Sequence, residues 1–213
     1  MPRRAEVTGS YSREDTLAHH RLFCGKEQHY PGGDFMSQND YRAKMRTRFA
    51  TFDIDGDGEV TAADFEAMAR RVIEEFEVRE GSPEASAILE GAHRFFVGLA
   101  EATDTDGSGS ISEREFLEGA EQRLLDNPEG FDAIARPWVQ SVIAIADVDR
   151  DGHVSVEEWA RALQAMGPNE RVAEKDLQSV DRDRDGRVTL EEATAAVAEY
   201  YTSARSLDLF ANA

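Results

Sequence analysis

Hydrophobic side chains recur every three or four residues along most of the chain after residue 40, and short acidic segments interrupt this pattern. The first stripe, Tyr41, Met45, Phe49 and Phe52, predicts an amphipathic helix because residues at this spacing lie on one helix face. Similar stripes predict helices over about residues 62–79, from residue 83 through 99, around 116–127, from about 130 through 143, and around 159–166, 172–177 and 193–200. The pattern therefore predicts an all-α protein.

Turn and capping residues mark the ends of several of these helices. Ser82 is placed to cap a helix whose first residue is Pro83, and Asn169 is placed to cap the short helix before residue 181. Asn127-Pro128 and Gly167-Pro168 end the helices that precede them. No linker rich in Pro, Gly and Ser separates the helices into two halves, so we expect one compact domain.

Four of the interruptions follow one twelve-residue pattern, with an acid or a serine at positions 1, 3 and 5, glycine at 6, an aliphatic residue at 8 and an acid at 12. We call them loops one to four: residues 53–64, 104–115, 147–158 and 181–192. Positions 1, 3, 5 and 12, with the backbone carbonyl of position 7, are the predicted metal ligands. These are Asp53, Asp55, Asp57, Glu59 and Asp64; Asp104, Asp106, Ser108, Ser110 and Glu115; Asp147, Asp149, Asp151, His153 and Glu158; and Asp181, Asp183, Asp185, Arg187 and Glu192.

The chemistry of these residues is that of a calcium site. Calcium is a hard cation that takes six to eight oxygen ligands at about 2.3–2.6 Å, so a tight turn must bring many short acidic side chains together. Glycine at position 6 allows the chain to reverse with a backbone that other residues adopt only at a cost. Each loop ends in Ser/Thr-x-x-acid, which by itself would only be a capping box that begins a helix. The acidic run upstream of each box favours metal binding in addition to capping.

This pattern resembles the EF-hand superfamily, and the layout from Met36 onward is similar to that of the sarcoplasmic calcium-binding proteins and their bacterial relative calerythrin. The resemblance implies four EF-hands in two pairs, packed as one compact domain and holding up to four Ca²⁺ ions. Residues at position 8 of paired loops form a short β contact in such proteins. We expect loop one to pair with loop two, and loop three with loop four.

Loop one departs from the others at position 12, where Asp64 replaces glutamate. Its side chain is one methylene shorter, so bidentate contact with an ion requires the following helix to lie closer to the loop. An acid that offers a single oxygen suits the smaller, octahedral Mg²⁺. We therefore expect Mg²⁺ to compete with Ca²⁺ mainly at loop one.

Charge and composition limit the classes of partner that are compatible with this sequence. The formal net charge is −19, and residues 1–35 contribute none of it. Such a field attracts cations and repels nucleic acid, which is excluded as a partner. No hydrophobic run approaches the roughly 18 residues of a membrane span, so membrane insertion is not expected. The single cysteine, Cys24, favours a reducing, cytoplasmic location. We expect a monomer, and a protein target is compatible with the sequence but not indicated by it.

The chain divides into three parts. Residues 1–35 have weak periodicity and are interpreted either as a disordered extension or as a segment upstream of the native start, because Met36-Ser37-Gln38-Asn39-Asp40 has the form of a start followed by a helix cap. Residues 36–127 contain the first two hands. Residues 128–213 contain the other two and an apolar tail, Leu207, Leu209 and Phe210, which we expect to pack on the core.

Two calcium functions remain open. A buffer or store binds the ion tightly and opens little, whereas a sensor that regulates a partner protein opens a flexible, Met-rich groove. Met45, Met68 and Met166 are too few and too scattered for such a groove, which favours the buffer. Light-emitting photoproteins share this architecture, but no set of His, Trp and Tyr matches their luciferin pocket. His93 is predicted to be a buried core histidine, and no catalytic set is present, so an enzyme is not predicted.

Overall fold

The structure is a computed structural model that describes residues 37–151, 153–167, 177 and 180–203. The chain separates into a unit of residues 1–33 and a unit of residues 34–213, and every described residue belongs to the second unit. The predictions for residues 1–35, for the cap at Asn169 and for the apolar tail lie outside the described residues.

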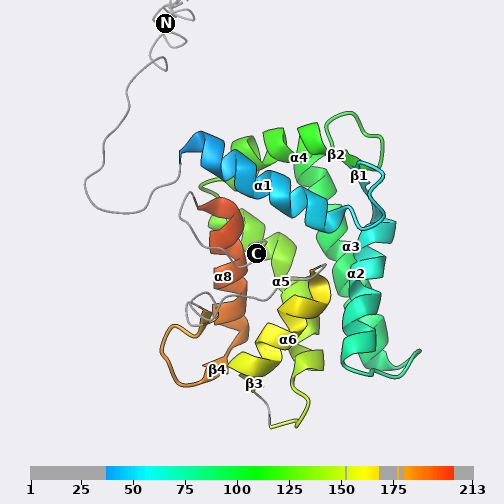
Figure 1. The fold of residues 1–213 in the computed structure, drawn as a ribbon, viewed down its shortest axis with the longest axis vertical. Coiled ribbons are helices and arrows are strands. Elements are labelled where there is room, and N and C mark those ends of the chain that lie inside the picture. The colour runs from blue at the N-terminus through cyan, green and yellow to red at the C-terminus, as the bar shows by residue number, and fades with distance from the viewer. Residues whose placement is uncertain (1–36, 152, 168–176, 178–179, 204–213) are drawn as a thin grey trace, which may run out of the picture. The chain divides into compact units, whose positions relative to one another are not determined.

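The described residues form seven α-helices and two small sheets, which confirms the predicted all-α fold (Figure 1). The first two hands contain α1 (Gln38–Phe52), β1 (Glu59–Val60), α2 (Ala62–Glu75), α3 (Pro83–Thr103), β2 (Ile111–Ser112), α4 (Glu113–Gly119) and a π-helical turn, η1 (Ala120–Leu124). The other two contain α5 (Pro128–Ala146), β3 (Val154–Ser155), α6 (Val156–Met166), β4 (Arg187–Val188) and α8 (Leu190–Thr202).

Each described α-helix begins at a polar capping residue. The Ser82 side chain accepts a hydrogen bond from the Ala85 N–H, and Pro83 begins α3. Three bounds differ from the prediction. The helix predicted around residues 116–127 is interrupted, because α4 ends at Gly119 and the π-helical turn η1 follows it to Leu124. α2 ends at Glu75 rather than near residue 79, because Glu77 has a φ of 51°, which a right-handed helix does not allow. α5 begins at Pro128 rather than near residue 130, because Asn127 is its N-cap.

The loops pair as predicted. β1 and β2 are antiparallel, with Val60 opposite Ile111, and β3 and β4 are antiparallel, with Val154 opposite Val188. All four residues occupy position 8 of their loops and are buried. Each short sheet therefore joins the two hands of one pair.

α3 and α5, the helices that lead into loops two and three, pack closely because α3 has glycine at the contact. A Cβ on Gly91 would lie 2.6 Å from Ser141 Oγ and 3.0 Å from the Pro137 carbonyl oxygen, and a Cβ on Gly98 would lie 2.8 Å from Ile134 Cγ2. The two pairs are thus joined by helix packing as well as by the chain.

One hydrophobic core contains residues of all four hands, among them Phe52, Phe95, Phe131 and Tyr200. The prediction for His93 is wrong, because this residue is exposed. Its neighbours Ala92 and Phe95 point inward, while His93 lies on the outer edge of α3, four residues before the exposed Val97. Among the described helices, none combines the length and the apolar character that crossing a membrane requires.

Candidate metal centre

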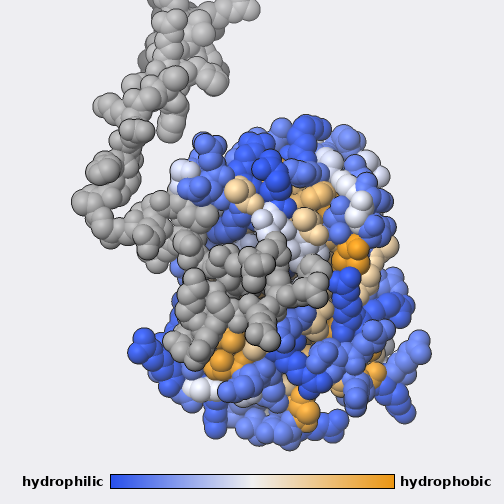
Figure 2. Space-filling model, viewed as in Figure 1, coloured by the Kyte–Doolittle hydropathy of each residue, from blue (hydrophilic) through white to orange (hydrophobic). Residues whose placement is uncertain are grey.

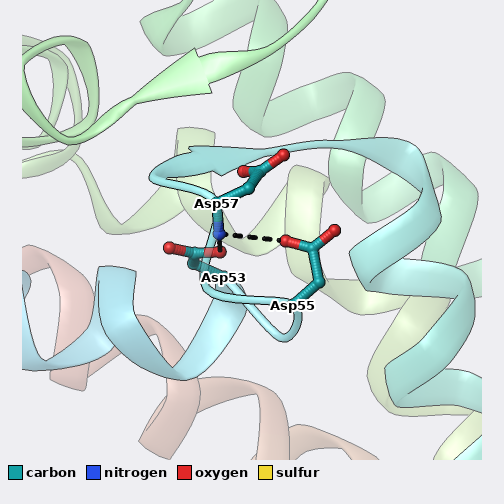
Figure 3. A group of neighbouring side chains, drawn as sticks. All are labelled: Asp53, Asp55 and Asp57. Atoms are coloured by element: carbon teal, nitrogen blue, oxygen red, sulfur yellow. Dashed lines mark hydrogen bonds between the residues drawn. The ribbon is translucent and has the colours of Figure 1, made fainter.

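Loop one gathers three carboxylates directly after α1. Asp53 is the C-cap of that helix. The Asp57 N–H donates to Asp53 Oδ1 at 3.0 Å and to Asp55 Oδ1 at 3.1 Å (Figure 3). The Gly58 N–H donates to the other oxygen of Asp53 at 3.0 Å. One oxygen from each of the three aspartates lies within 4.8 Å of the others, so the backbone of the turn holds the acids together.

The same hydrogen bonds recur in loops three and four. The N–H of position 5 donates to the carboxylates of positions 1 and 3, at 3.1 Å in loop three and 3.2 Å in loop four. In loop two, Ser108 at position 5 donates its N–H to Asp106 Oδ1 at 2.9 Å and its hydroxyl to the Ser110 carbonyl oxygen at 3.1 Å. Loops one, three and four therefore share one arrangement, whereas in loop two the Gly107 N–H donates to Asp104 Oδ1 at 2.8 Å in place of the N–H of position 5.

The acid at position 12 is held from two sides. In loop two, Glu115 Oε1 accepts from the Thr105 N–H at 3.1 Å, and Oε2 accepts from the Ser112 N–H at 3.1 Å and hydroxyl at 2.7 Å. Glu158 and Glu192 have the same partners at positions 2 and 9 of their loops. The capping box and the loop thus share one carboxylate.

Asp64 makes the same contacts with a shorter side chain. Its Oδ1 accepts from the Ile54 N–H at 3.1 Å, and its Oδ2 accepts from the Thr61 N–H at 2.8 Å. The backbone of Thr61 is rotated to a φ of −126°, whereas the residues at position 9 of the other loops have φ values of −72°, −68° and −81°. The Thr61 hydroxyl donates to Asp64 Oδ2 at 2.7 Å and accepts from the Ala63 N–H at 3.2 Å. The start of α2 therefore adapts to the missing methylene.

Four groups of acids result, one in each loop. Their members are Asp53, Asp55 and Asp57; Asp104, Asp106 and Glu115; Asp147, Asp149 and Asp151; and Asp181, Asp183 and Glu192. Position 12 belongs to the group in loops two and four but not in loops one and three. The predicted carbonyl ligands at position 7 lie in β1 and β4 (Glu59 and Arg187) or directly before β2 and β3 (Ser110 and His153), and the His153 side chain is exposed, as predicted.

For the three glutamates at position 12, this arrangement favours the ionised form by lowering the pKa. The Ser112 hydroxyl, together with backbone donors, lowers the pKa of Glu115 to about 2, against an opposing effect of burial. For Glu158 and Glu192 burial raises the pKa, but hydrogen bonds from position 9 and from the loop outweigh it, and the net pKa is lowered.

The groups fit a hard divalent cation. Every predicted ligand atom is an oxygen, which suits calcium or magnesium and not the metals that prefer sulfur or imidazole. Like charges within 4.8 Å repel one another, and a bound cation relieves this repulsion. In the part of the chain that the structure describes, Asp53, Asp55, Asp57 and Asp64 form no ion pair. The first loop thus has no internal counter-charge.

Position 4 of the loops is a functional position that the sequence pattern did not reveal. Its backbone is left-handed in all four loops, with φ values of 74° at Gly56, 71° at Gly107, 58° at Arg150 and 61° at Arg184. Glycine adopts this conformation without strain, whereas arginine does so at a cost. The glycines of loops one and two were the available signal, and the arginines of the other loops obscured it.

Comparison with known proteins agrees with this geometry. The sequence matches the family "EF-hand domain pair" over residues 42–121 and the family "EF hand" over residues 139–163 and 175–192. Calerythrin from Saccharopolyspora erythraea is 26% identical over 167 residues, which cover 78% of this chain and 94% of calerythrin. The solved structure of a Streptomyces coelicolor calcium-binding protein is 39% identical, with a TM-score of 0.71, over 76% of this chain and 98% of that one.

More distant structures share the fold. A sarcoplasmic calcium-binding protein from amphioxus is 19% identical, with a TM-score of 0.58, over 79% of this chain and 92% of that one. These three relatives are non-enzymatic calcium-binding proteins, in agreement with the prediction that this chain is not an enzyme. The chain belongs to the EF-hand family, in the group of four-hand proteins that includes calerythrin and the sarcoplasmic calcium-binding proteins.

Proposed function

We propose that this protein binds calcium ions in its four loops and acts as an intracellular calcium buffer or store. The observation that carries the proposal is the presence of four groups of acids with oxygen atoms within 4.8 Å of one another. The side chains at positions 1, 3, 5 and 12 and the carbonyl at position 7 of each loop are the proposed ligands. Backbone N–H groups of the same loops, including that of position 5, hold the acids together before an ion binds.

The buried methionines favour a buffer over a sensor. A sensor exposes a Met-rich hydrophobic groove when it binds calcium. Met45, Met68 and Met166 are 0%, 1% and 4% exposed and belong to the common core. Opening such a groove would require the core to separate, at the cost of the hydrophobic contacts between hands.

The described surface also offers little for a target helix. Figure 2 shows hydrophilic residues over most of the described surface on this face, with hydrophobic residues in small separate groups. Val97 and Val148 are the large hydrophobic residues that are exposed within the described part of the chain. Exposed hydrophobic residues that occur singly do not indicate a docking site.

Loop one is the proposed site of competition with Mg²⁺. Asp64 reaches the same donors as the glutamates only because Thr61 has rotated, so little freedom is left for a bidentate contact with a large ion. An octahedral ion needs only one oxygen from this position.

A regulatory role is the second candidate. The Streptomyces coelicolor relative, which is 39% identical, is a calcium-binding protein whose structure concerns prokaryotic calcium-mediated regulation by that protein. A regulator of this kind would act through a partner protein, with the calcium loops as its input.

One titration distinguishes the two candidates. Calcium is added to the metal-free protein in millimolar Mg²⁺, and binding stoichiometry is measured together with the fluorescence of a dye that reports exposed hydrophobic surface. A buffer lowers dye fluorescence as the loops fill, because the helices become ordered on the core. A rise in fluorescence would favour the regulator, and an absence of calcium binding would contradict both.

A further inference from the structure

The C-terminal end of α8 is capped by residues from the other EF pair. The last carbonyl groups of a helix have no hydrogen-bond donor within the helix. In α8 and its C-cap residue, three successive carbonyls accept from hands one and two. The contacts are Tyr41 Oη to the Tyr201 oxygen at 2.7 Å, the Asp126 N–H to the Thr202 oxygen at 2.8 Å, and Lys44 Nζ to the Ser203 oxygen at 3.1 Å.

The Tyr41–Tyr201 contact is buried, the Lys44–Ser203 contact is partly buried, and Asp126 is exposed; together they replace the usual helix terminus. Tyr41, Lys44 and Tyr201 are buried, and Arg48 of α1 also donates to the Tyr201 hydroxyl. α8 has no basic residue in its own last turn, and Ser203 at its C-cap has a φ of −116°, so no glycine turn satisfies the carbonyls. In Figure 1 the end of α8 (red) lies beside the start of α1 (blue).

The donors and the acceptors belong to elements that carry predicted ligands. α1 leads directly into Asp53, position 1 of loop one. Asp126 follows α4 and η1, and α4 carries Glu115, position 12 of loop two. α8 carries Glu192, position 12 of loop four, in its first turn. The Tyr41 hydroxyl also lies 3.3 Å from the Ala120 carbonyl oxygen, at the start of η1.

We propose that these three contacts, the α8 latch, couple calcium binding in loops one and two to calcium binding in loop four. The inference rests on the proposed function. Calcium in the first pair orders α1 and the segment at Asp126, which places the three donors on the end of α8. A capped α8 holds Glu192 in place for loop four, and by thermodynamic linkage calcium in loop four stabilises the first pair in return.

The variant Tyr41→Phe tests the latch, because it removes one hydroxyl and keeps the buried ring. Thr194→Val is the matched control, since the Thr194 hydroxyl is also buried on α8 and donates to a carbonyl, that of Leu190, within the same helix. Each variant is made in the intact protein and in a background where Asp53→Ala and Asp104→Ala disable loops one and two. Calcium affinity at loop four is followed by the NMR amide signal of Gly186.

We expect the disabled background to weaken calcium binding at loop four by about fivefold or more, which is the lower end of typical coupling between sites. Tyr41→Phe should weaken loop four severalfold in the intact protein and by less than about twofold in the disabled background. Thr194→Val should have the same effect in both.

Equal effects of Tyr41→Phe in the two backgrounds would overturn the coupling, and so would a loop four that is indifferent to the loss of loops one and two. Failure of the unmodified protein to bind calcium at loop four would instead contradict the proposed function.

Discussion

Replacement of Gly119 by alanine tests the packing next to the first ligand of loop two. Gly119 ends α4, and a Cβ there would lie 2.6 Å from Cγ2, 2.9 Å from Cβ and 3.0 Å from Cα of Thr103. Thr103 is fully buried, precedes Asp104, and donates its hydroxyl to the Leu99 carbonyl oxygen at 2.8 Å. A rotation of the threonine side chain leaves its Cβ and Cα in place, so α3 and α4 must move apart.

The structure bounds the size of this effect. Overpacking of a buried site costs about 1–3 kcal/mol, and contact with a backbone atom places Gly119→Ala in the upper part of that range. Gly119 has helical dihedral angles, φ −67° and ψ −39°. Alanine is about 1 kcal/mol more favourable than glycine in a helix, which offsets part of the packing cost. The expected net loss is about 1–2 kcal/mol, or a Tm lower by roughly 2–8 °C for a protein of this size.

Thermal unfolding of the calcium-saturated protein, followed by circular dichroism, measures this loss. Gly98→Ala is the comparison, because all its nearest contacts are atoms of the half-buried Ile134 side chain, the closest at 2.8 Å. That side chain can shift toward solvent, so we expect a smaller loss. A Gly119→Ala variant as stable as the unmodified protein would refute the reasoning, as would a larger loss for Gly98→Ala.

Three further predictions concern the loops. Removal of calcium by a chelator should lower the Tm, because four groups of like charges then repel one another, and an unchanged Tm would contradict metal binding. Asp64→Glu should raise the calcium-over-magnesium preference of loop one in competition titrations, and an unchanged preference would remove the role assigned to the short side chain. Arg150→Gly and Arg184→Gly should each stabilise the protein by up to about 1 kcal/mol, because they relieve a left-handed backbone. Arg182→Gly is their control, since Arg182 does not have a positive φ and pairs with Glu199 at 3.1 Å; it should destabilise, and equal losses at Arg182 and Arg184 would show that backbone strain is not the cause.

Local signals in the sequence were sufficient for most of the helices and for the loops. Stripes such as Tyr41, Met45, Phe49 and Phe52 predicted helices because periodicity indicates which face is buried, whatever the partner is. Ser82 and Pro83 predicted the start of α3 because capping depends on residues that are close in the chain. The expected pairing of loop one with two and of loop three with four was also confirmed, and the aliphatic residues at position 8 form the contact.

Features that depend on distant neighbours were not predicted. His93 lies beside two phenylalanines in sequence, but the packing of α3 leaves it on the exposed edge. The π-helical turn after Gly119 interrupts the helix predicted around residues 116–127, and the left-handed backbone of Arg150 and Arg184 belongs to the turn of each loop. Intrinsic preference is weak compared with such constraints.

The sequence by itself determined the four acidic loops, the helices that flank them and the residues that cap those helices, because each of these rests on contacts within about a dozen residues of the chain. Only the tertiary structure decided how the two pairs are joined. Tyr41 and Tyr201 are 160 positions apart, and neither carries a local sign that one caps the helix of the other. The carbonyl groups at the end of α8 needed donors, and which residues supply them depends on the packing of all four hands.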